Sequence, residues 1–174
     1  MAVTYLKRAD KTPQTGTDET REIVQAMLAK IEAGGEDAAI AYGRDLDGYH
    51  SDIVVPADTI AAAGDEISQQ LKDDIRFAHD RVTTFAEAHK KSITEFETEL
   101  SPGLWAGQKL IPIETAGCYG PGGRYAHVAS AIMSIATARV AGVEHIVACT
   151  APRGDAGPNP AILYAVSYTH LRAH

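Results

Sequence analysis

Residues 116–142 read A-G-C-Y-G-P-G-G-R-Y-A-H-V-A-S-A-I-M-S-I-A-T-A-R-V-A-G, and this stretch decides the fold. Its first four residues form a short apolar segment typical of a strand, and a glycine-rich loop follows. The apolar, alanine-rich run after the loop predicts a helix that ends at Gly142. Residues 144–150, E-H-I-V-A-C-T, then predict a buried strand. Strand, loop, helix and strand make a βαβ unit, which builds a parallel sheet.

The residues before this unit predict mostly helices. An amphipathic helix is expected over 17–33, where acids crowd the first turn and two glycines close the end, and a second helix over 36–46. The short apolar segment 52–55 predicts a strand, and Pro56 can open another helix as its first residue. Residues 68–90 carry apolar side chains at spacings of three and four, which predicts a long helix with a charged outer face.

The fold class is therefore α/β. We expect a mostly helical N-terminal region over 1–100, followed over 101–165 by the start of a Rossmann-like, parallel-sheet domain that is incomplete. Within this domain, residues 104–113 alternate loosely and contain β-formers, and residues 159–165 read as the opening of another helix.

Composition and charge narrow the class of partner. Of the 174 residues, 45% are hydrophobic and 22% are charged, which is ordinary for a globular chain, and the formal net charge is −7. That charge argues against nucleic acid and against an anionic membrane surface, so a small molecule is the expected partner. The sequence has no apolar run long enough for a membrane span and no signal-peptide core at its N-terminus, and we expect a cytoplasmic protein.

The cysteines and the helical histidines give no sign of a metal site. Cys118 and Cys149 lie in the two strand segments, where we expect them to be buried, inert thiols of a reducing compartment. No Cys or His stands beside them at zinc-ligand spacing. His79 and His89 lie on the long helix and are expected at the surface.

The glycine loop lies where open α/β sheets bind ligands, beyond the carboxyl end of a strand and at a helix N-terminus. Gly120, Gly122 and Gly123 would let backbone N–H groups approach an anion closely. Their spacing matches neither the dinucleotide pattern G-x-G-x-x-G nor the phosphate loop G-x-x-x-x-G-K. On the glycines alone, a ligand loop and a tight turn that needs positive φ are equally good interpretations.

Side chains around the loop favour a ligand slightly. Tyr119 ends the strand, Arg124 and Tyr125 follow the glycines, and His127 opens the helix, so stacking surface, a cation and hydrogen-bond donors gather at one loop. Each residue also has a structural interpretation. Tyr119 could cap the core, Arg124 could be a solvated loop residue, and His127 could only satisfy the first turn of the helix.

Residues 107–165 resemble the histidinol dehydrogenase family. The likeness rests on G-Q-K-L-I-P-I, C-Y-G-P-G-G-R-Y, M-S-I-A-T-A-R-V-A-G-V and N-P-A-I-L-Y-A, where the family signature is Y-V-P-G-G followed by a helix ending in K-V-A-G-V. With the N-terminal helices it covers nearly all of residues 1–165. Within the family, G-G-R-Y-A-H-V-A-S-A-I-M-S is more similar to the sulfopropanediol dehydrogenase branch than to histidinol dehydrogenase proper.

The resemblance implies an NAD-dependent, zinc-containing alcohol dehydrogenase that is a homodimer at full length. It implies that Tyr119 contacts NAD and, less directly, that Gly122 and Gly123 let the backbone approach the cofactor. Gly120 stands where the family has valine, which leaves the pose of the tyrosine open. The family's zinc ligands and its catalytic Glu-His pair lie in its later half, so we assign this chain no metal ligand and no catalytic residue and expect it to be inactive alone.

The substrate and the role of the short chain stay open at this stage. Arg124 and His127 are candidates for substrate contact, because a guanidinium would repel the histidinol cation and hold a sulfonate. The alternative is that Arg124 faces the cofactor pyrophosphate. Two alternatives to a sulfopropanediol-type dehydrogenase remain. The protein could be histidinol dehydrogenase proper, or the short chain could be a non-catalytic nucleotide-binding or oligomerisation module. Residues 166–174 depart from the family pattern and are expected to be a non-native tail; His170 and His174, four residues apart, make an unfavoured metal pair.

Overall fold

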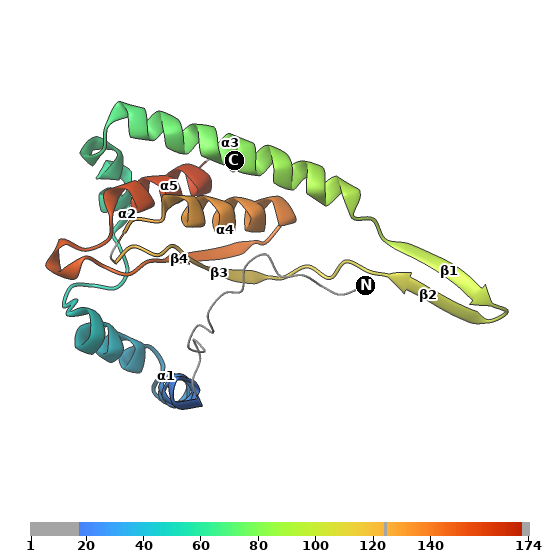
Figure 1. Cartoon of the computed structure of the whole chain (residues 1–174), viewed down its shortest axis with the longest axis horizontal. Coiled ribbons are helices and arrows are strands. Elements are labelled where there is room, and N and C mark those ends of the chain that lie inside the picture. Colours follow the sequence, from blue (N-terminus) through green and yellow to red (C-terminus); the bar gives the residue numbers. More distant parts are fainter. Residues whose placement is uncertain (1–17, 124, 172–174) are drawn as a thin grey trace, which may run out of the picture. The chain divides into compact units, whose positions relative to one another are not determined.

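The computed structural model describes residues 18–123 and 125–171 as a mixed α/β protein (Figure 1). The elements in chain order are α1 (Asp18–Asp47), α2 (Ala57–Ala62), the 3-10 helix η1 (Ala63–Glu66), α3 (Gln69–Ser92), β1 (Phe96–Ser101), β2 (Leu104–Gln108), β3 (Thr115–Tyr119), α4 (Val128–Ala141), β4 (His145–Cys149), the 3-10 helix η2 (Gly154–Ala156) and α5 (Pro160–Leu171).

The chain divides into two compact units, residues 1–46 and residues 47–174. The first contains nearly all of α1, whose helix is broken at Gly35, where φ is 60° and ψ is −142°. Glycine adopts this conformation without a Cβ penalty, so the two helices expected over 17–33 and 36–46 are confirmed as the two arms of a kinked element. Within this unit, the Lys30 ammonium lies 5.0 Å from the Tyr42 ring centroid.

The βαβ unit lies in the second unit and is confirmed. Strand β3 pairs with β4 in parallel, with Thr115 opposite His145 and Tyr119 opposite Cys149. Helix α4 connects the two strands and ends where predicted, at Gly142, whose φ of 95° gives the left-handed C-cap. This cap donates its N–H to the Arg139 carbonyl oxygen at 2.9 Å, which closes the last turn before β4 begins.

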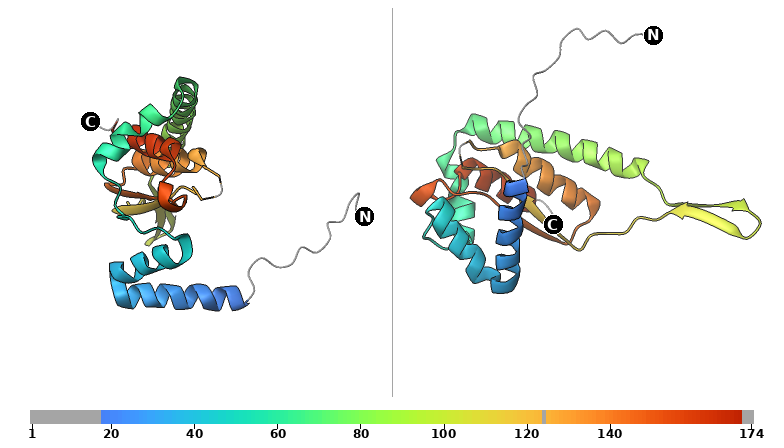
Figure 2. Two further views of the ribbon diagram at one scale, coloured as in Figure 1. Left: turned by 90° about the vertical axis from the view of Figure 1, so that its left-hand side faces the viewer. Right: turned by 60° about the horizontal axis from the view of Figure 1, so that its bottom comes forward.

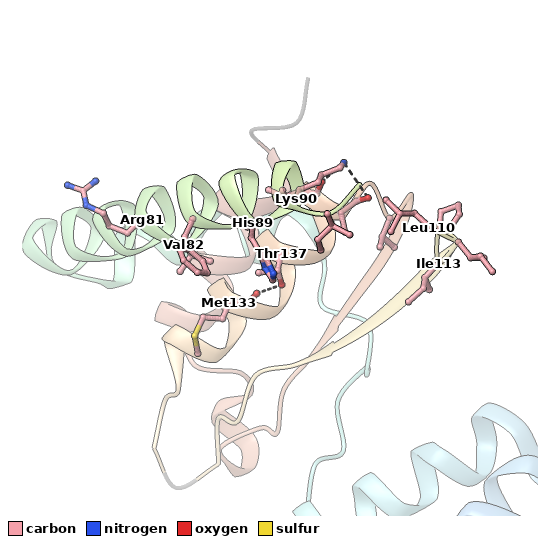
Figure 3. A pocket seen from close by; sticks show the side chains of 16 residues that line it. Arg81, Val82, His89, Lys90, Leu110, Ile113, Met133 and Thr137 are labelled. Atoms are coloured by element: carbon pink, nitrogen blue, oxygen red, sulfur yellow. Dashed lines mark hydrogen bonds between the residues drawn. The ribbon is translucent and has the colours of Figure 1, made fainter. Parts of the chain in front are cut away.

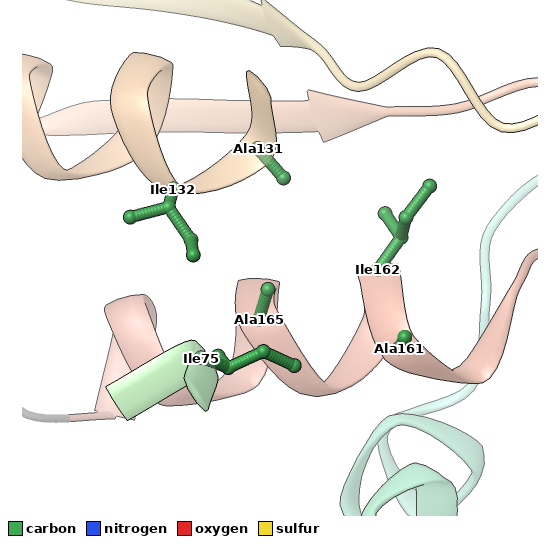
Figure 4. Packing of buried hydrophobic residues seen from close by; sticks show 6 residues of the cluster. All are labelled: Ile75, Ala131, Ile132, Ala161, Ile162 and Ala165. Atoms are coloured by element: carbon green, nitrogen blue, oxygen red, sulfur yellow. The ribbon is translucent and has the colours of Figure 1, made fainter. Parts of the chain in front are cut away.

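Three helices, α3, α4 and α5, lie on one side of this small sheet (Figures 1 and 2). Helix α3 begins after Ser68, whose side-chain oxygen accepts the N–H of Leu71 at 3.2 Å. The core lies between the helices (Figure 4), and alanines on α4 and α5 allow close approach of their backbones. Its buried members are Ile75, Ala131, Ile132, Ala161, Ile162 and Ala165.

Strands β1 and β2 form a hairpin in which every residue is exposed. The chain turns through Gly103, with φ of 80°, and the Glu99 carboxylate accepts the N–H of Gly103 at 2.8 Å. A side chain at Gly107 would collide with the Phe96 carbonyl oxygen, so glycine is needed there for the strands to pair. Strand β2 lies within the predicted 104–113, whereas β1 was not expected from the sequence.

Four expectations need correction. Residues 52–55 form no strand, and Pro56 is the N-cap of α2 rather than its first residue. Only Cys118 is buried; Cys149 is exposed, as is most of β4, because the described helices of the second unit lie on one side of the sheet. His79 is buried, since the Tyr168 ring packs against it in a T-shaped arrangement with centroids 5.0 Å apart.

Candidate functional site

The candidate site is the glycine loop, residues 120–127, at the carboxyl ends of β3 and β4. Two backbone hydrogen bonds hold it. The N–H of Gly120 donates to the Cys149 carbonyl oxygen at 2.9 Å, and the N–H of His127 donates to the Pro121 carbonyl oxygen at 2.9 Å. The first bond extends the parallel pairing by one step, and the second leads the chain into α4. The loop is thus fixed at both ends and opens toward the N-terminus of α4, which is electropositive.

The three loop glycines differ in what they contact, and none has positive φ. A Cβ on Gly122 would collide with Thr150 Oγ1 and lie 2.9 Å from the Ala151 carbonyl oxygen. A Cβ on Gly123 would meet only Ala151 Cβ, at 3.8 Å, and one on Gly120 would make an ordinary contact of 3.4 Å with Ala131. The interpretation of these glycines as a turn that needs positive φ is therefore wrong. Gly122 is required because the loop packs directly on the segment after β4, whereas a side chain at Gly123 would make only an ordinary contact with Ala151.

The side chains that flank the loop point to a surface rather than a core role. Tyr119 is the last residue of β3 and is 57% exposed, so it does not cap the core. His127 is the N-cap of α4 but makes no side-chain capping bond, so its imidazole does not satisfy the first turn. Tyr125 is also exposed. Arg124 lies outside the described residues. The structure thus brings two tyrosine rings and an imidazole to one open loop.

Thr150 belongs to this site and was missed in the sequence. It follows β4 directly, and its Oγ1 is buried against Gly122 without a hydrogen-bond partner among the described residues. Parallel strands end at one edge of a sheet, so the residue after β4 is a neighbour of the residues after β3. Applying that rule to the second strand as well as the first would have identified Thr150.

The residues present fit an anionic, ring-containing cofactor. An exposed tyrosine, glycines at a strand end and the N-terminus of a helix are features found in dinucleotide sites, and all three are present here. Across the part of the chain that the structure describes, no three His, Cys, Asp or Glu side chains come together as metal ligands. The side chain of His170 and the whole of His174 lie outside that part. Nor does any described helix have the length and apolar character of a membrane span.

These features define an α/β protein with a glycine loop between a parallel strand and a helix. Comparison with known proteins narrows the class. The histidinol dehydrogenase family profile matches residues 10–173, so the chain belongs to the histidinol dehydrogenase family.

The relatives agree with that assignment. The chain is 48% identical over 165 residues to sulfopropanediol 3-dehydrogenase of Ruegeria pomeroyi, which covers 95% of the chain and 38% of the relative. It is 51% identical over 167 residues to a histidinol dehydrogenase homolog of the same organism, covering 96% of the chain and 39% of the relative. The crystal structure of histidinol dehydrogenase from Elizabethkingia anophelis superposes with a TM-score of 0.77 at 28% identity, covering 90% of this chain and 36% of that one. The chain thus spans less than two fifths of the length of these relatives.

Proposed function

We propose that this chain is the N-terminal part of an NAD-dependent, zinc-assisted alcohol dehydrogenase that oxidises a small polar alcohol such as sulfopropanediol. The observation that carries the proposal is the match of nearly the whole chain to a family whose named members are dehydrogenases, at 48% identity to a sulfopropanediol 3-dehydrogenase. A second candidate, histidinol oxidation, is supported by a weaker likeness, 33% identity over 152 residues to histidinol dehydrogenase of Methanosarcina mazei.

In this proposal the glycine loop receives NAD, which would accept a hydride from the alcohol. The Tyr119 ring lies against the cofactor, because it is exposed at the carboxyl end of β3. Gly123 would give the close backbone approach, since it is exposed and carries no side chain. Gly122 acts indirectly: it lets the loop pack on Thr150 and Ala151 and so fixes where the other two residues stand.

The remaining parts of the proposed enzyme lie outside these residues. The zinc ligands and the acid-base residues would come from the longer polypeptide that carries this sequence, so the isolated chain would be inactive. Arg124 and His127 would attract the anionic end of a substrate toward the N-terminus of α4. The complete enzyme would be a cytoplasmic homodimer acting on a small molecule.

The substrate proposal has a direct kinetic test. Purified longer protein is assayed with NAD and either sulfopropanediol or histidinol, following NADH absorbance. We expect higher kcat/KM for sulfopropanediol, and we expect Arg124→Ala to raise KM for that anion while leaving KM for a neutral alcohol unchanged. Turnover of histidinol alone would replace the first candidate by the second. An Arg124→Ala enzyme with unchanged KM for the sulfonate would show that the guanidinium does not bind it.

A further inference from the structure

Thr150 stands directly beyond the last pairing step of the sheet, beside the glycine loop. Strand β4 ends at Cys149, whose carbonyl oxygen accepts the N–H of Gly120 at 2.9 Å. The next residue turns its Oγ1 against Gly122, so closely that a Cβ at that glycine would overlap it. This oxygen is buried, and no described residue donates a proton to it or accepts one from it. The Thr150 hydroxyl is therefore buried and unpaired in the described part of the chain.

An unpaired hydroxyl at this position does not help the fold. Helical threonines of the same unit donate their hydroxyls to carbonyl oxygens of the preceding turn, as seen at Thr84, Thr137 and Thr169. A buried hydroxyl without a partner destabilises a folded chain, whereas a valine of similar shape would avoid that cost. Native proteins keep few buried polar groups without a partner, and each of these groups requires an explanation such as binding or catalysis. The Thr150 hydroxyl is therefore expected to find its partner in a ligand-bound state.

The surroundings of this hydroxyl favour a partner that accepts hydrogen bonds and carries negative charge. Residues 115–143, which span β3, the glycine loop and α4, contain no aspartate or glutamate, although the chain has 23 of them. No described residue accepts the N–H of Gly122 or Gly123, and the loop leads into the electropositive N-terminus of α4. Unpaired donors therefore gather at the carboxyl ends of the two strands, and an anionic oxygen is the group that satisfies them.

A ligand at the loop is within reach of the Thr150 side chain. The residue as a whole is partly exposed, although its Oγ1 is packed against Gly122. Rotation about χ1 between staggered positions turns the hydroxyl away from the glycine. The next loop residues with described side chains, including Tyr125, are exposed, so the surface that the hydroxyl can turn toward is open to solvent.

We propose that the Thr150 hydroxyl donates a hydrogen bond to a phosphate oxygen of the ligand at the glycine loop, which is the pyrophosphate of NAD in the proposed function. The identity of that ligand rests on the proposed function. The hydroxyl is unpaired in the free protein and paired in the complex, so it increases affinity and lowers the stability of the free protein. The cofactor is then held from the ends of both parallel strands, by Tyr119 after β3 and by Thr150 after β4.

Substitutions that keep the shape of the side chain test this hydrogen bond. NADH is titrated into the longer protein that carries this sequence, and binding is followed by NADH fluorescence. Thr150→Val loses the hydroxyl and should raise Kd by about tenfold or more, as expected for a hydrogen bond to a charged group. Thr150→Ser keeps the hydroxyl and should restore most of the affinity.

Thr137→Val is the matched control. Thr137 lies about 15 Å along α4 from His127, beside an apolar groove of about 830 Å³ formed by α3, residues 110–113 and α4 (Figure 3). Its hydroxyl donates to the Met133 carbonyl oxygen within the helix. Loss of this hydroxyl leaves the glycine loop unchanged, so the affinity for NADH should not change.

Thermal unfolding without ligand separates binding from a structural role. Thr150→Val removes an unpaired buried hydroxyl, so its melting temperature should equal or exceed that of the unmodified protein. A threonine with only a structural role would lose stability and affinity together. In steady-state kinetics, Thr150→Val should raise KM for NAD and leave KM for the alcohol unchanged.

Two competing ligands identify the atom that the hydroxyl contacts. Inorganic pyrophosphate and adenosine are each used to displace NADH from the unmodified protein and from Thr150→Val. The substitution should weaken pyrophosphate by about the same factor as NADH, because both carry the phosphate oxygens. It should leave adenosine unchanged, because adenosine has none.

Several results would overturn the inference. They are equal NADH affinity in Thr150→Val and the unmodified protein, joint loss of affinity and melting temperature, a rise in KM for the alcohol alone, or equal weakening of pyrophosphate and adenosine. Failure of the unmodified protein to bind NADH would instead refute the proposed function. The inference would then depend on pyrophosphate alone, which should raise the melting temperature of the unmodified protein but not of Thr150→Val; the same response in both proteins would overturn it.

Discussion

The substitution Gly122→Ala tests whether loop packing fixes the candidate site. The new Cβ would collide with Thr150 Oγ1, lie 2.9 Å from the Ala151 carbonyl oxygen and lie 3.2 Å from Ile162 Cδ1. The Ala151 carbonyl oxygen belongs to the backbone and cannot move without displacing the segment after β4, whereas Thr150 Oγ1 would have to rotate away about χ1. Overpacking of this kind costs about 1–3 kcal/mol. With a urea m-value of about 2 kcal/mol/M, a loss of about 2 kcal/mol lowers the midpoint by about 1 M.

Two measurements follow the effect of Gly122→Ala on the fold. Urea unfolding monitored by circular dichroism gives the change in free energy of unfolding. Thiol labelling gives a local measure, because exposed Cys149 reacts at once whereas buried Cys118 reacts only when the packing of β3 opens. We expect Gly122→Ala to lower the urea midpoint and to speed labelling of Cys118.

The matched control is Gly117→Ala in β3. A Cβ there has nothing within 4 Å, and φ at Gly117 is not positive. This change should leave stability unchanged or raise it by up to about 1 kcal/mol. Combining Gly122→Ala with Thr150→Ala should recover part of the loss, since one of the colliding atoms is gone. A Gly122→Ala chain as stable as the Gly117→Ala chain would refute the packing argument.

Two further stability predictions use the same urea assay. Lys90→Met should lower the free energy of unfolding by roughly 0.3–1 kcal/mol, because Lys90 Nζ donates to the Val140 carbonyl oxygen at 2.7 Å at the C-terminus of α4. The control is Lys91→Met at the neighbouring position. Equal losses in the two variants would show that Lys90 does not cap α4. Asn159→Ala should lower the free energy of unfolding by about 1 kcal/mol, because Asn159 Oδ1 accepts the N–H of Ala161 at 2.9 Å in the first turn of α5. Asn159→Asp should keep this cap and most of the stability. Equal losses in both variants would contradict the capping role of Asn159.

The sequence predicted the elements whose signals are local. Helix α4 ends at Gly142 because that residue takes the left-handed conformation, and α3 begins after Ser68 because its side chain caps the first turn. The switch from strand to helical periodicity around residues 116–142 was enough to predict the parallel β3–β4 pair. These features depend on residues within one turn or one strand, which a sequence window contains.

Two of the four errors, at His79 and Cys149, concern features that depend on distant partners. His79 is buried because of Tyr168, which is far away in the sequence, and Cys149 is exposed because the described helices of the second unit lie on one side of the sheet. The contact of Gly122 with Thr150 joins two loops at one sheet edge. Neither the periodicity nor the composition of a segment contains such information. The positions of Tyr119 and His127 at the loop were predicted, whereas the exposure of Tyr119 and the missing capping bond of His127 are seen only in the structure.

The most direct test of the central proposal is NADH binding at the glycine loop. NADH is titrated into the longer protein that carries this sequence, with Tyr119→Ala as the variant and Gly117→Ala as the control. We expect saturable binding by the unmodified and control proteins and an affinity roughly tenfold lower for Tyr119→Ala, because the ring contact is lost. Equal affinity in all three proteins would contradict a cofactor contact at Tyr119, and absence of binding by the unmodified protein would contradict the loop as an NAD site.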